Sequence, residues 1–201
     1  MPLKRSSTRT LRVGRPRSES ARRAVLEATR SLVEKGGYAA ATIEAIAARS
    51  GVAKTTIYRW WPNRPALVVD LLMGMAATDV PPPSGPDPLG AVRKEMRGIA
   101  AASDHLMGRL LTSLLGEAQR DPEIRAALLD GLFRPRTNAT GKMIRAAQAA
   151  GRLRKDVPAP VIVDLLVGPL FYRMFVQHQP LTDAFVTQVF RCVTAGLEPQ
   201  R

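Results

Sequence analysis

The sequence predicts an all-α protein with a small N-terminal and a larger C-terminal helical domain. Apolar residues recur at helical spacing along most of the 201-residue chain, and no alternating run of β-branched residues appears. The proline-rich stretch 81–88 cannot be helical and therefore separates the two parts. Because 45% of the residues are hydrophobic, the chain can bury a sizeable core.

The first 17 residues are basic and offer almost nothing to pack. They hold six Lys or Arg residues among Ser, Thr, Gly and Pro, which predicts a disordered arm over residues 1–17. Arg15 and Arg17 stand directly before the first helix. Arginines in such an arm can enter a narrow minor groove of DNA or contact its phosphates, although a solubilising tail has the same composition.

Three helices are expected next. The first should span residues 18–35, with Ala21, Val25, Ala28 and Leu32 on its core face and Gly36 at its end. Tyr38 should pack beneath the two helices that follow.

Those two helices flank a glycine. Thr42 is a good N-cap for one of them, and Gly51 can take the left-handed turn that ends it. The second helix directs polar side chains outward, which predicts a helix-turn-helix. Its outward residues are Lys54, Thr55, Thr56, Tyr58 and Arg59.

At these residues the chain resembles the DNA-binding domain of the TetR family of bacterial transcriptional regulators. The resemblance covers roughly residues 22–72. Its matching positions include Gly36-Gly37-Tyr38, Thr42, Ile46-Ala47, Gly51-Val52, Lys54, Ile57-Tyr58 and Asn63-Arg64-Pro65-Ala66-Leu67.

The resemblance implies a set of DNA contacts. Thr55 and Thr56 would meet base edges, Lys54 a guanine or a phosphate, and Tyr58 a phosphate. Asn63 should cap the next helix, whose first amides together with Arg64 would hold a further phosphate. Ala53 replaces the Ser that is common in relatives, so the start of this helix is expected to lack a side-chain cap. Thr55 replaces a common Gly, so a relative's base preference does not carry over. The full set expected at DNA is Arg15, Arg17, Thr42, Lys54, Thr55, Thr56, Tyr58, Trp60, Asn63 and Arg64.

The distribution of charge agrees with a polyanionic partner. Residues 1–64 hold 14 of the 30 basic residues and only 4 of the 17 acidic ones, in a chain of net charge +13. The basic excess therefore lies on the helix-turn-helix part, which favours nucleic acid.

The connecting helix should run from Asn63 to about residue 78 and complete a DNA-binding domain over residues 18–80. Five further helices are expected in a regulatory and dimerisation domain over residues 81–201. Pro135 and Gly168-Pro169 should kink or break the helices that contain them. The five ranges are 89–101, 104–119, 121–150, 159–176 and 182–195.

The last two helices carry more apolar surface than one face needs. TetR-like regulators usually dimerise through a four-helix bundle built from these helices, so the resemblance implies a homodimer. Residues 161–176 are too short to span a bilayer and are interrupted by Asp164 and Arg173, which predicts a buried helix and no membrane partner. Candidate interface residues are Val161, Leu165, Phe185, Val189 and Val193.

A small apolar effector would bind among the helices of residues 89–150. Methionine suits a pocket that must adapt to varied apolar shapes, but at helical spacing the same residues would look alike in a dry core. The candidate walls are Met96, Leu106, Met107, Leu110, Leu114, Met143 and Phe171.

No catalytic residue, cofactor or metal site is expected. The phosphate-cradling and nucleophile motifs of enzymes are missing from the sequence, and His105, His178 and Cys192 are too few for anything but a sparse metal site. The single cysteine and the missing signal peptide predict a cytoplasmic protein. The resemblance to DNA-binding regulators implies that it associates with the bacterial nucleoid.

The favoured function is a dimeric repressor that binds a palindromic operator and is released by a small-molecule effector. A sequence-tolerant DNA-packaging protein and a small-molecule enzyme remain as alternatives, and activation instead of repression stays open.

Overall fold

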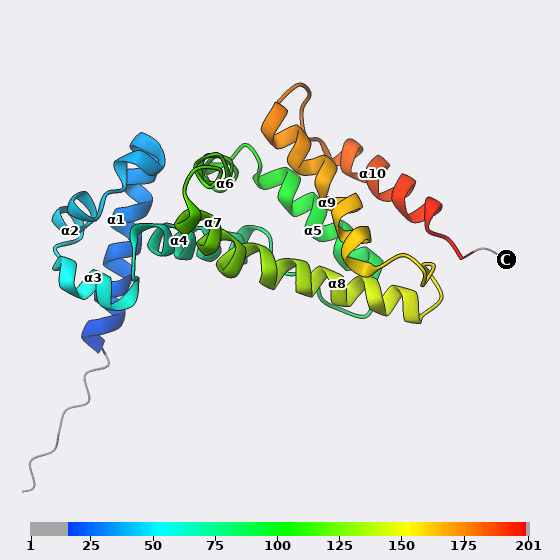
Figure 1. Cartoon of the computed structure of the whole chain (residues 1–201), viewed down its shortest axis with the longest axis horizontal. Helices are drawn as coiled ribbons and strands as arrows, with labels where there is room; N and C mark the ends of the chain where they lie inside the picture. The colour runs from blue at the N-terminus through cyan, green and yellow to red at the C-terminus, as the bar shows by residue number, and fades with distance from the viewer. Residues whose placement is uncertain (1–15, 200–201) are drawn as a thin grey trace, which may run out of the picture.

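The computed structural model describes residues 16–199, and this part of the chain is helical without any strand (Figure 1). Ten α-helices and one π-helical turn, η1, make up the described residues. They are α1 (Pro16–Ala40), α2 (Ile43–Ser50), α3 (Lys54–Trp60), α4 (Arg64–Asp79), α5 (Pro88–Ala102), α6 (Leu106–Glu117), α7 (Pro122–Leu128), η1 (Leu129–Phe133), α8 (Arg134–Ala149), α9 (Ala159–Val176) and α10 (Asp183–Gly196).

Helix α1 begins earlier than expected. It begins at Pro16, so the backbone of Arg17 is helical and the expected arm is wrong for its last two residues; Arg15 and the rest of the arm lie outside the described residues. Gly36 interrupts the helical backbone as predicted, and Gly37 has a φ of 66°, a conformation that glycine adopts without steric strain. A further turn then leads to Ala40.

The helix-turn-helix forms at the predicted residues because its local signals agree. The Thr42 hydroxyl accepts a hydrogen bond from the Ala45 amide at 3.1 Å, and Gly51 has a φ of 68° in the turn that ends α2. Ala53 gives α3 no side-chain cap. The apolar face of the motif is buried completely at Ile46 and Ile57.

Helix α4 joins the two halves of the molecule. It contacts α1 on one side and α6, α7 and η1 on the other, and seven of its 16 residues are buried. Leu67 and Leu72 on α4 share one hydrophobic core with Leu114 on α6 and Leu128 on α7. The core therefore crosses the boundary that the sequence places at residues 80 and 81.

Residues 122–149 are helical throughout, and the helix expected over residues 121–150 is interrupted directly before Pro135, where the sequence predicts a kink or break. The structure has α7, the wider turn η1, and then α8. Pro135 lies in the first turn of α8, where it cannot donate an amide hydrogen bond to the preceding turn. At Gly131 a Cβ atom would lie 2.8 Å from Val69 Cγ1, so η1 packs closely on α4. The other helices of the C-terminal half lie within two residues of their predicted bounds.

Helix α9 is continuous through Pro169, so the expected break there does not occur. The prediction of a buried helix holds for one face only. By length and composition α9 could cross a membrane, but only 33% of it is buried within this fold. The inner face packs through Ile162, Leu166 and Leu170 against a second core, which α5, α8 and α10 complete.

Candidate nucleic-acid interface and cavity

Helix α3 presents polar side chains to solvent. Lys54, Thr55 and Arg59 are exposed, and Tyr58 is 49% exposed. Thr56 is half-buried. The sequence-predicted reading face is therefore available to a partner, while Ile57 on the opposite face anchors α3 to the core.

Lys54 has an acidic neighbour that the helical pattern does not reveal. Its ammonium lies 2.6 Å from Glu44 Oε1 on α2, and both side chains are exposed. The hydrogen bond and charge of Lys54 hold the pKa of Glu44 below its ordinary value. The face of α3 that is expected to contact DNA therefore has the carboxylate of Glu44 next to the ammonium of Lys54.

The two tryptophans differ in their surroundings. Trp61 is buried, and its indole N–H donates to Asp70 on α4 at 2.9 Å. Arg22 pairs with the same Asp70 and lies 5.5 Å from the centroid of the Trp61 ring. Trp60 is half-buried, meets Trp61 edge-on at 5.6 Å between centroids, and so retains some accessible surface.

Asn63 and Arg64, which are expected to hold a phosphate at the start of α4, also contact side chains of other helices. The Arg64 guanidinium lies over the Tyr38 ring at 3.9 Å from its centroid, and burial raises the pKa of Tyr38. Asn63 caps α4 by accepting from the Ala66 amide at 2.9 Å, and its side-chain amide donates to Glu123 on α7 at 3.2 Å. Both anchor residues are half-buried.

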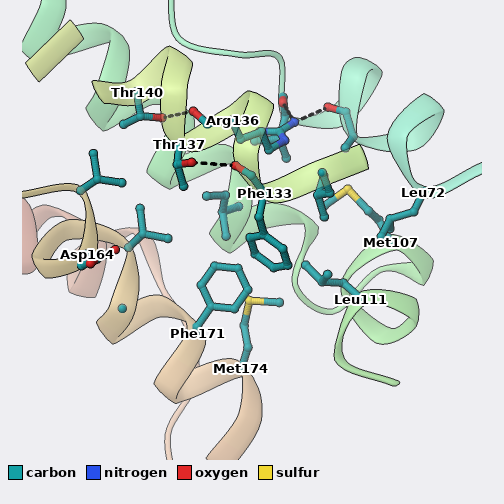
Figure 2. A pocket seen from close by; sticks show the side chains of 17 residues that line it. Leu72, Met107, Leu111, Phe133, Arg136, Thr137, Thr140, Asp164, Phe171 and Met174 are labelled. Carbon is teal, nitrogen blue, oxygen red and sulfur yellow. Dashed lines mark hydrogen bonds between the residues drawn. The ribbon is translucent and has the colours of Figure 1, made fainter. Parts of the chain in front are cut away.

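A cavity of about 380 Å³ lies between α4, α5, α6, η1, α8 and α9 (Figure 2). Its walls are mainly apolar, and the rings of Phe133 and Phe171 approach to 5.9 Å between centroids. The lining consists of Leu72, Ala76, Val80, Ile99, Met107, Leu111, Leu132, Phe133, Arg136, Thr137, Thr140, Val163, Asp164, Val167, Gly168, Phe171 and Met174.

Only two of the seven candidate pocket residues, Met107 and Phe171, line this cavity. The others do not line it because they pack into the cores instead. Met96, Leu110 and Leu114 are fully or almost fully buried, and Leu106 and Met143 are half-buried against the cores.

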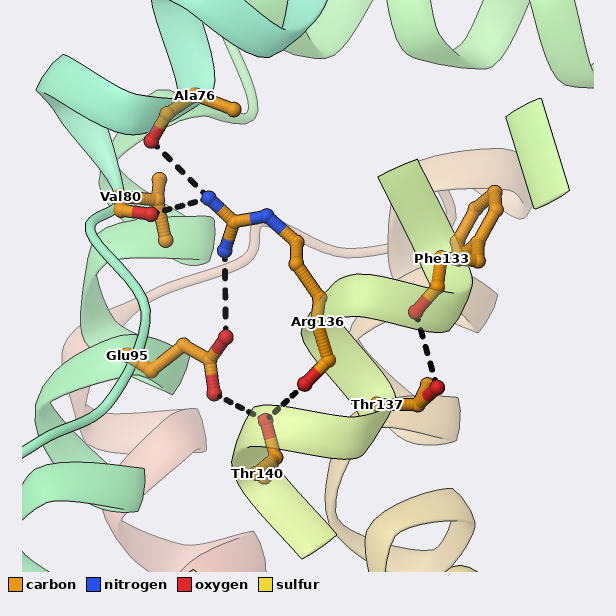
Figure 3. A network of polar contacts seen from close by, with 7 residues as sticks. All are labelled: Ala76, Val80, Glu95, Phe133, Arg136, Thr137 and Thr140. Atoms are coloured by element: carbon orange, nitrogen blue, oxygen red, sulfur yellow. Dashed lines mark hydrogen bonds and ion pairs between the residues drawn. The ribbon is translucent and has the colours of Figure 1, made fainter. Parts of the chain in front are cut away.

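A polar network closes one end of the cavity and holds the end of α4 (Figure 3). One terminal nitrogen of Arg136 donates to Glu95 Oε1 at 3.2 Å. The other donates to the carbonyls of Ala76, at 3.0 Å, and Val80. Thr140 donates to Glu95 Oε2 at 2.7 Å. Burial raises the pKa of Glu95, and the contacts of Thr140 and Arg136 oppose this rise.

The outer face of α9 is exposed and apolar. Val161 and Leu165 are 45% and 47% exposed, and Tyr172, Phe175 and Val176 extend the same face. The candidate interface residues on α10 are less accessible: Phe185, Val189 and Val193 are half-buried against the second core. Arg173 also covers the Phe185 ring at 3.4 Å from its centroid.

Comparisons with known proteins match both halves of the chain. Residues 25–71 match the family model for bacterial regulatory proteins of the tetR family, and residues 81–193 match the model for the tetracyclin repressor-like C-terminal domain. The uncharacterized HTH-type transcriptional regulator YdeS of Bacillus subtilis (strain 168) is 28% identical over 185 residues, which are 92% of this chain and 93% of YdeS.

Two further relatives bear on the fold and the DNA-binding part. The crystal structure of the TetR family transcription regulator SCO0332 superposes with a TM-score of 0.76 at 31% identity, and the match covers 90% of this chain and all of that one. The HTH-type transcriptional repressor KstR of Rhodococcus jostii (strain RHA1) is 43% identical over 51 residues, which are 25% of this chain and 24% of KstR.

Proposed function

This chain belongs to the TetR family of bacterial regulatory proteins, and from that premise we propose that it is a homodimeric repressor released from a palindromic operator by a small apolar effector. Its family and fold are those of DNA-binding transcriptional regulators and not of enzymes. A regulator of this kind acts in the cytoplasm, and we infer that it associates with the nucleoid.

The observation that carries the effector part is the course of α4. The helix starts after the reading helix α3, where Asn63 caps it, and Ala76 in its last turn and its C-cap Val80 line the cavity. A molecule that fills the cavity therefore contacts the same rigid helix that positions the DNA-binding domain. Displacing that helix changes the spacing of the two DNA-binding domains in a dimer. A 100-fold loss of DNA affinity needs a coupling free energy between effector and DNA of only about 2.7 kcal/mol.

The proposed DNA contacts divide by chemistry. Thr55 and Thr56 offer hydroxyl and methyl groups to base edges, whereas Tyr58 and Lys54 reach phosphates. Thr42, Trp60 and the Asn63-Arg64 pair would lie along the flanking backbone, and Arg15 and Arg17 would enter the minor groove.

The proposed dimer forms through the outer face of α9 together with α10. An exposed apolar strip on a long helix is the kind of surface that a second subunit buries. Two recognition helices related by a two-fold axis would enter major grooves about 34–36 Å apart, or a multiple of that distance.

Selection of bound DNA from a random pool, followed by footprinting, tests the proposal. A palindrome with this half-site spacing is expected. Thr55→Ala should change the relative preference among sequences, whereas Tyr58→Phe should weaken binding to all of them alike. Equal binding to every sequence would favour the DNA-packaging alternative and refute an operator-specific repressor.

A further inference from the structure

The cavity has one polar end and is otherwise nearly apolar. Arg136, Thr137 and Thr140 on α8 supply the polar end (Figure 3), and Asp164 on α9 is the remaining charged residue of the lining. Whatever fills the cavity must therefore be apolar over most of its surface. Its polar group, if it has one, finds partners chiefly at Arg136.

Two N–H donors of the Arg136 guanidinium have no acceptor among the described residues. A guanidinium carries five N–H donors, and three of them are used by Glu95, Ala76 and Val80. The Nε–H and one terminal N–H donate to no acceptor within residues 16–199. An oxygen acceptor on a ligand can take these donors without breaking the existing ion pair.

The charges around Arg136 favour a neutral acceptor. Glu95, with a side chain only 5% exposed, already balances the guanidinium charge at 3.2 Å. Asp164, an exposed residue of α9, supplies the one carboxylate among the lining residues. A ligand carboxylate would give up its hydration to meet a guanidinium whose charge Glu95 already balances, whereas a carbonyl oxygen would gain the hydrogen bond at a smaller desolvation cost.

We propose that the cavity binds a neutral, largely apolar molecule with one carbonyl-type oxygen, and that Arg136 is the residue that recognises this oxygen. The proposal rests on the proposed role of the cavity as the effector site, and it adds the chemical class of the ligand. Because Arg136 also holds the carbonyls of Ala76 and Val80, one side chain joins ligand recognition to the end of α4.

Three probes of nearly equal shape separate the possibilities. Benzylacetone, hydrocinnamate and isopentylbenzene share a phenylethyl group and end in a methyl ketone, a carboxylate and an isopropyl group. Binding is measured on the full-length protein, without DNA, as the ligand-dependent rise in melting temperature. The ketone should bind about tenfold more tightly than the hydrocarbon, the effect of one hydrogen bond to a charged donor, and the carboxylate should bind no more tightly than the hydrocarbon.

Arg136→Lys should abolish the preference for the ketone, because lysine keeps the charge facing Glu95 but lacks the guanidinium donors. Arg134→Lys is the matched control: Arg134 lies on the same helix, is exposed, and pairs with Asp130 away from the cavity. Circular dichroism verifies folding. If Arg136→Lys does not fold, the double variant Glu95→Gln with Arg136→Gln replaces the ion pair by two neutral amides and should lose the preference too.

Three results would overturn the proposal: equal affinity for ketone and hydrocarbon, tightest binding of hydrocinnamate, or an unchanged preference in folded Arg136→Lys. Binding of none of the probes by a protein that still binds its operator would also overturn it and leave the DNA-binding function intact. A ketone preference in a protein that binds no operator would support the cavity assignment and refute the repressor.

Discussion

The guanidinium of Arg64 at the start of α4 lies 3.9 Å from the centroid of the Tyr38 ring, which belongs to the last turn of α1. The contact fixes the two helices relative to each other next to the reading helix. Arg64 thus stabilises the DNA-binding domain in addition to any phosphate that it contacts.

Arg64→Ala should lower the free energy of unfolding by about 1 kcal/mol, a usual value for a cation–π contact at a partly exposed site. Arg120→Ala, at an exposed arginine beyond the end of α6, is the control. Chemical denaturation measures both variants. Equal stability of the two would mean that Arg64 acts on DNA alone.

Glu44→Gln should tighten DNA binding. The ammonium of Lys54 is held by Glu44 at 2.6 Å, and removing the carboxylate frees the cation and removes a repulsion with phosphate. If Lys54 then neutralises one more phosphate, the slope of log affinity against log salt should steepen by about 0.9. Fluorescence anisotropy over a salt series measures this, with Glu34→Gln on α1 as the control. Weaker binding would instead show that Glu44 positions Lys54 for its contact.

Leu165→Arg should prevent dimerisation without unfolding the subunit. Leu165 is 47% exposed, so its loss leaves no cavity in the monomer, whereas a charge there would have to be desolvated in an apolar interface. Light scattering should give the mass of one chain for this variant and of two chains for Ala146→Arg, an exposed position on α8. A variant that stays dimeric would place the interface elsewhere.

The stability contributed by Glu95 should fall as the pH rises. Burial raises its pKa, so the folded protein holds this proton more tightly than the unfolded chain does. The contribution is complete below the unfolded pKa of about 4.3 and is lost as the pH rises through the higher folded value. Chemical denaturation at a series of pH values should show the unfolding free energy of the wild type, relative to that of Glu95→Gln, decreasing over that window. An upward trend would mean that the attraction of Arg136 outweighs burial.

Local sequence signals were sufficient to predict most of the fold. Capping by Thr42 and Asn63, the turn at Gly51 and the helical spacing of apolar residues act within a few neighbours, and these features form where expected. An interruption at Pro135 was expected, but the wider turn η1 and the close approach of Gly131 to Val69 were not, because no local pattern encodes them.

The candidate site, like the fold, could be predicted only where it depends on residues that are close in sequence. The spacing of apolar residues identifies the outward face of α3. It does not reveal the hydrogen-bond partners of Lys54 and Asn63, because these partners, Glu44 and Glu123, lie on other helices. Cavity walls are harder still. Met107 and Leu110 are both buried apolar residues on α6, and only the packing of the surrounding helices leaves space beside Met107.

Helix α9 has the cavity on one side, at Val167 and Phe171, and the exposed apolar strip of Leu165 and Tyr172 on the other. In the proposed dimer, two cavities would lie back to back and be separated only by this helix and its symmetry mate. A molecule that displaces α9 from within then alters the surface on which the second subunit rests, so the first binding event changes the affinity of the second. Effector titrations of the dimer should accordingly give a Hill coefficient different from one, whereas a folded monomeric variant should give one.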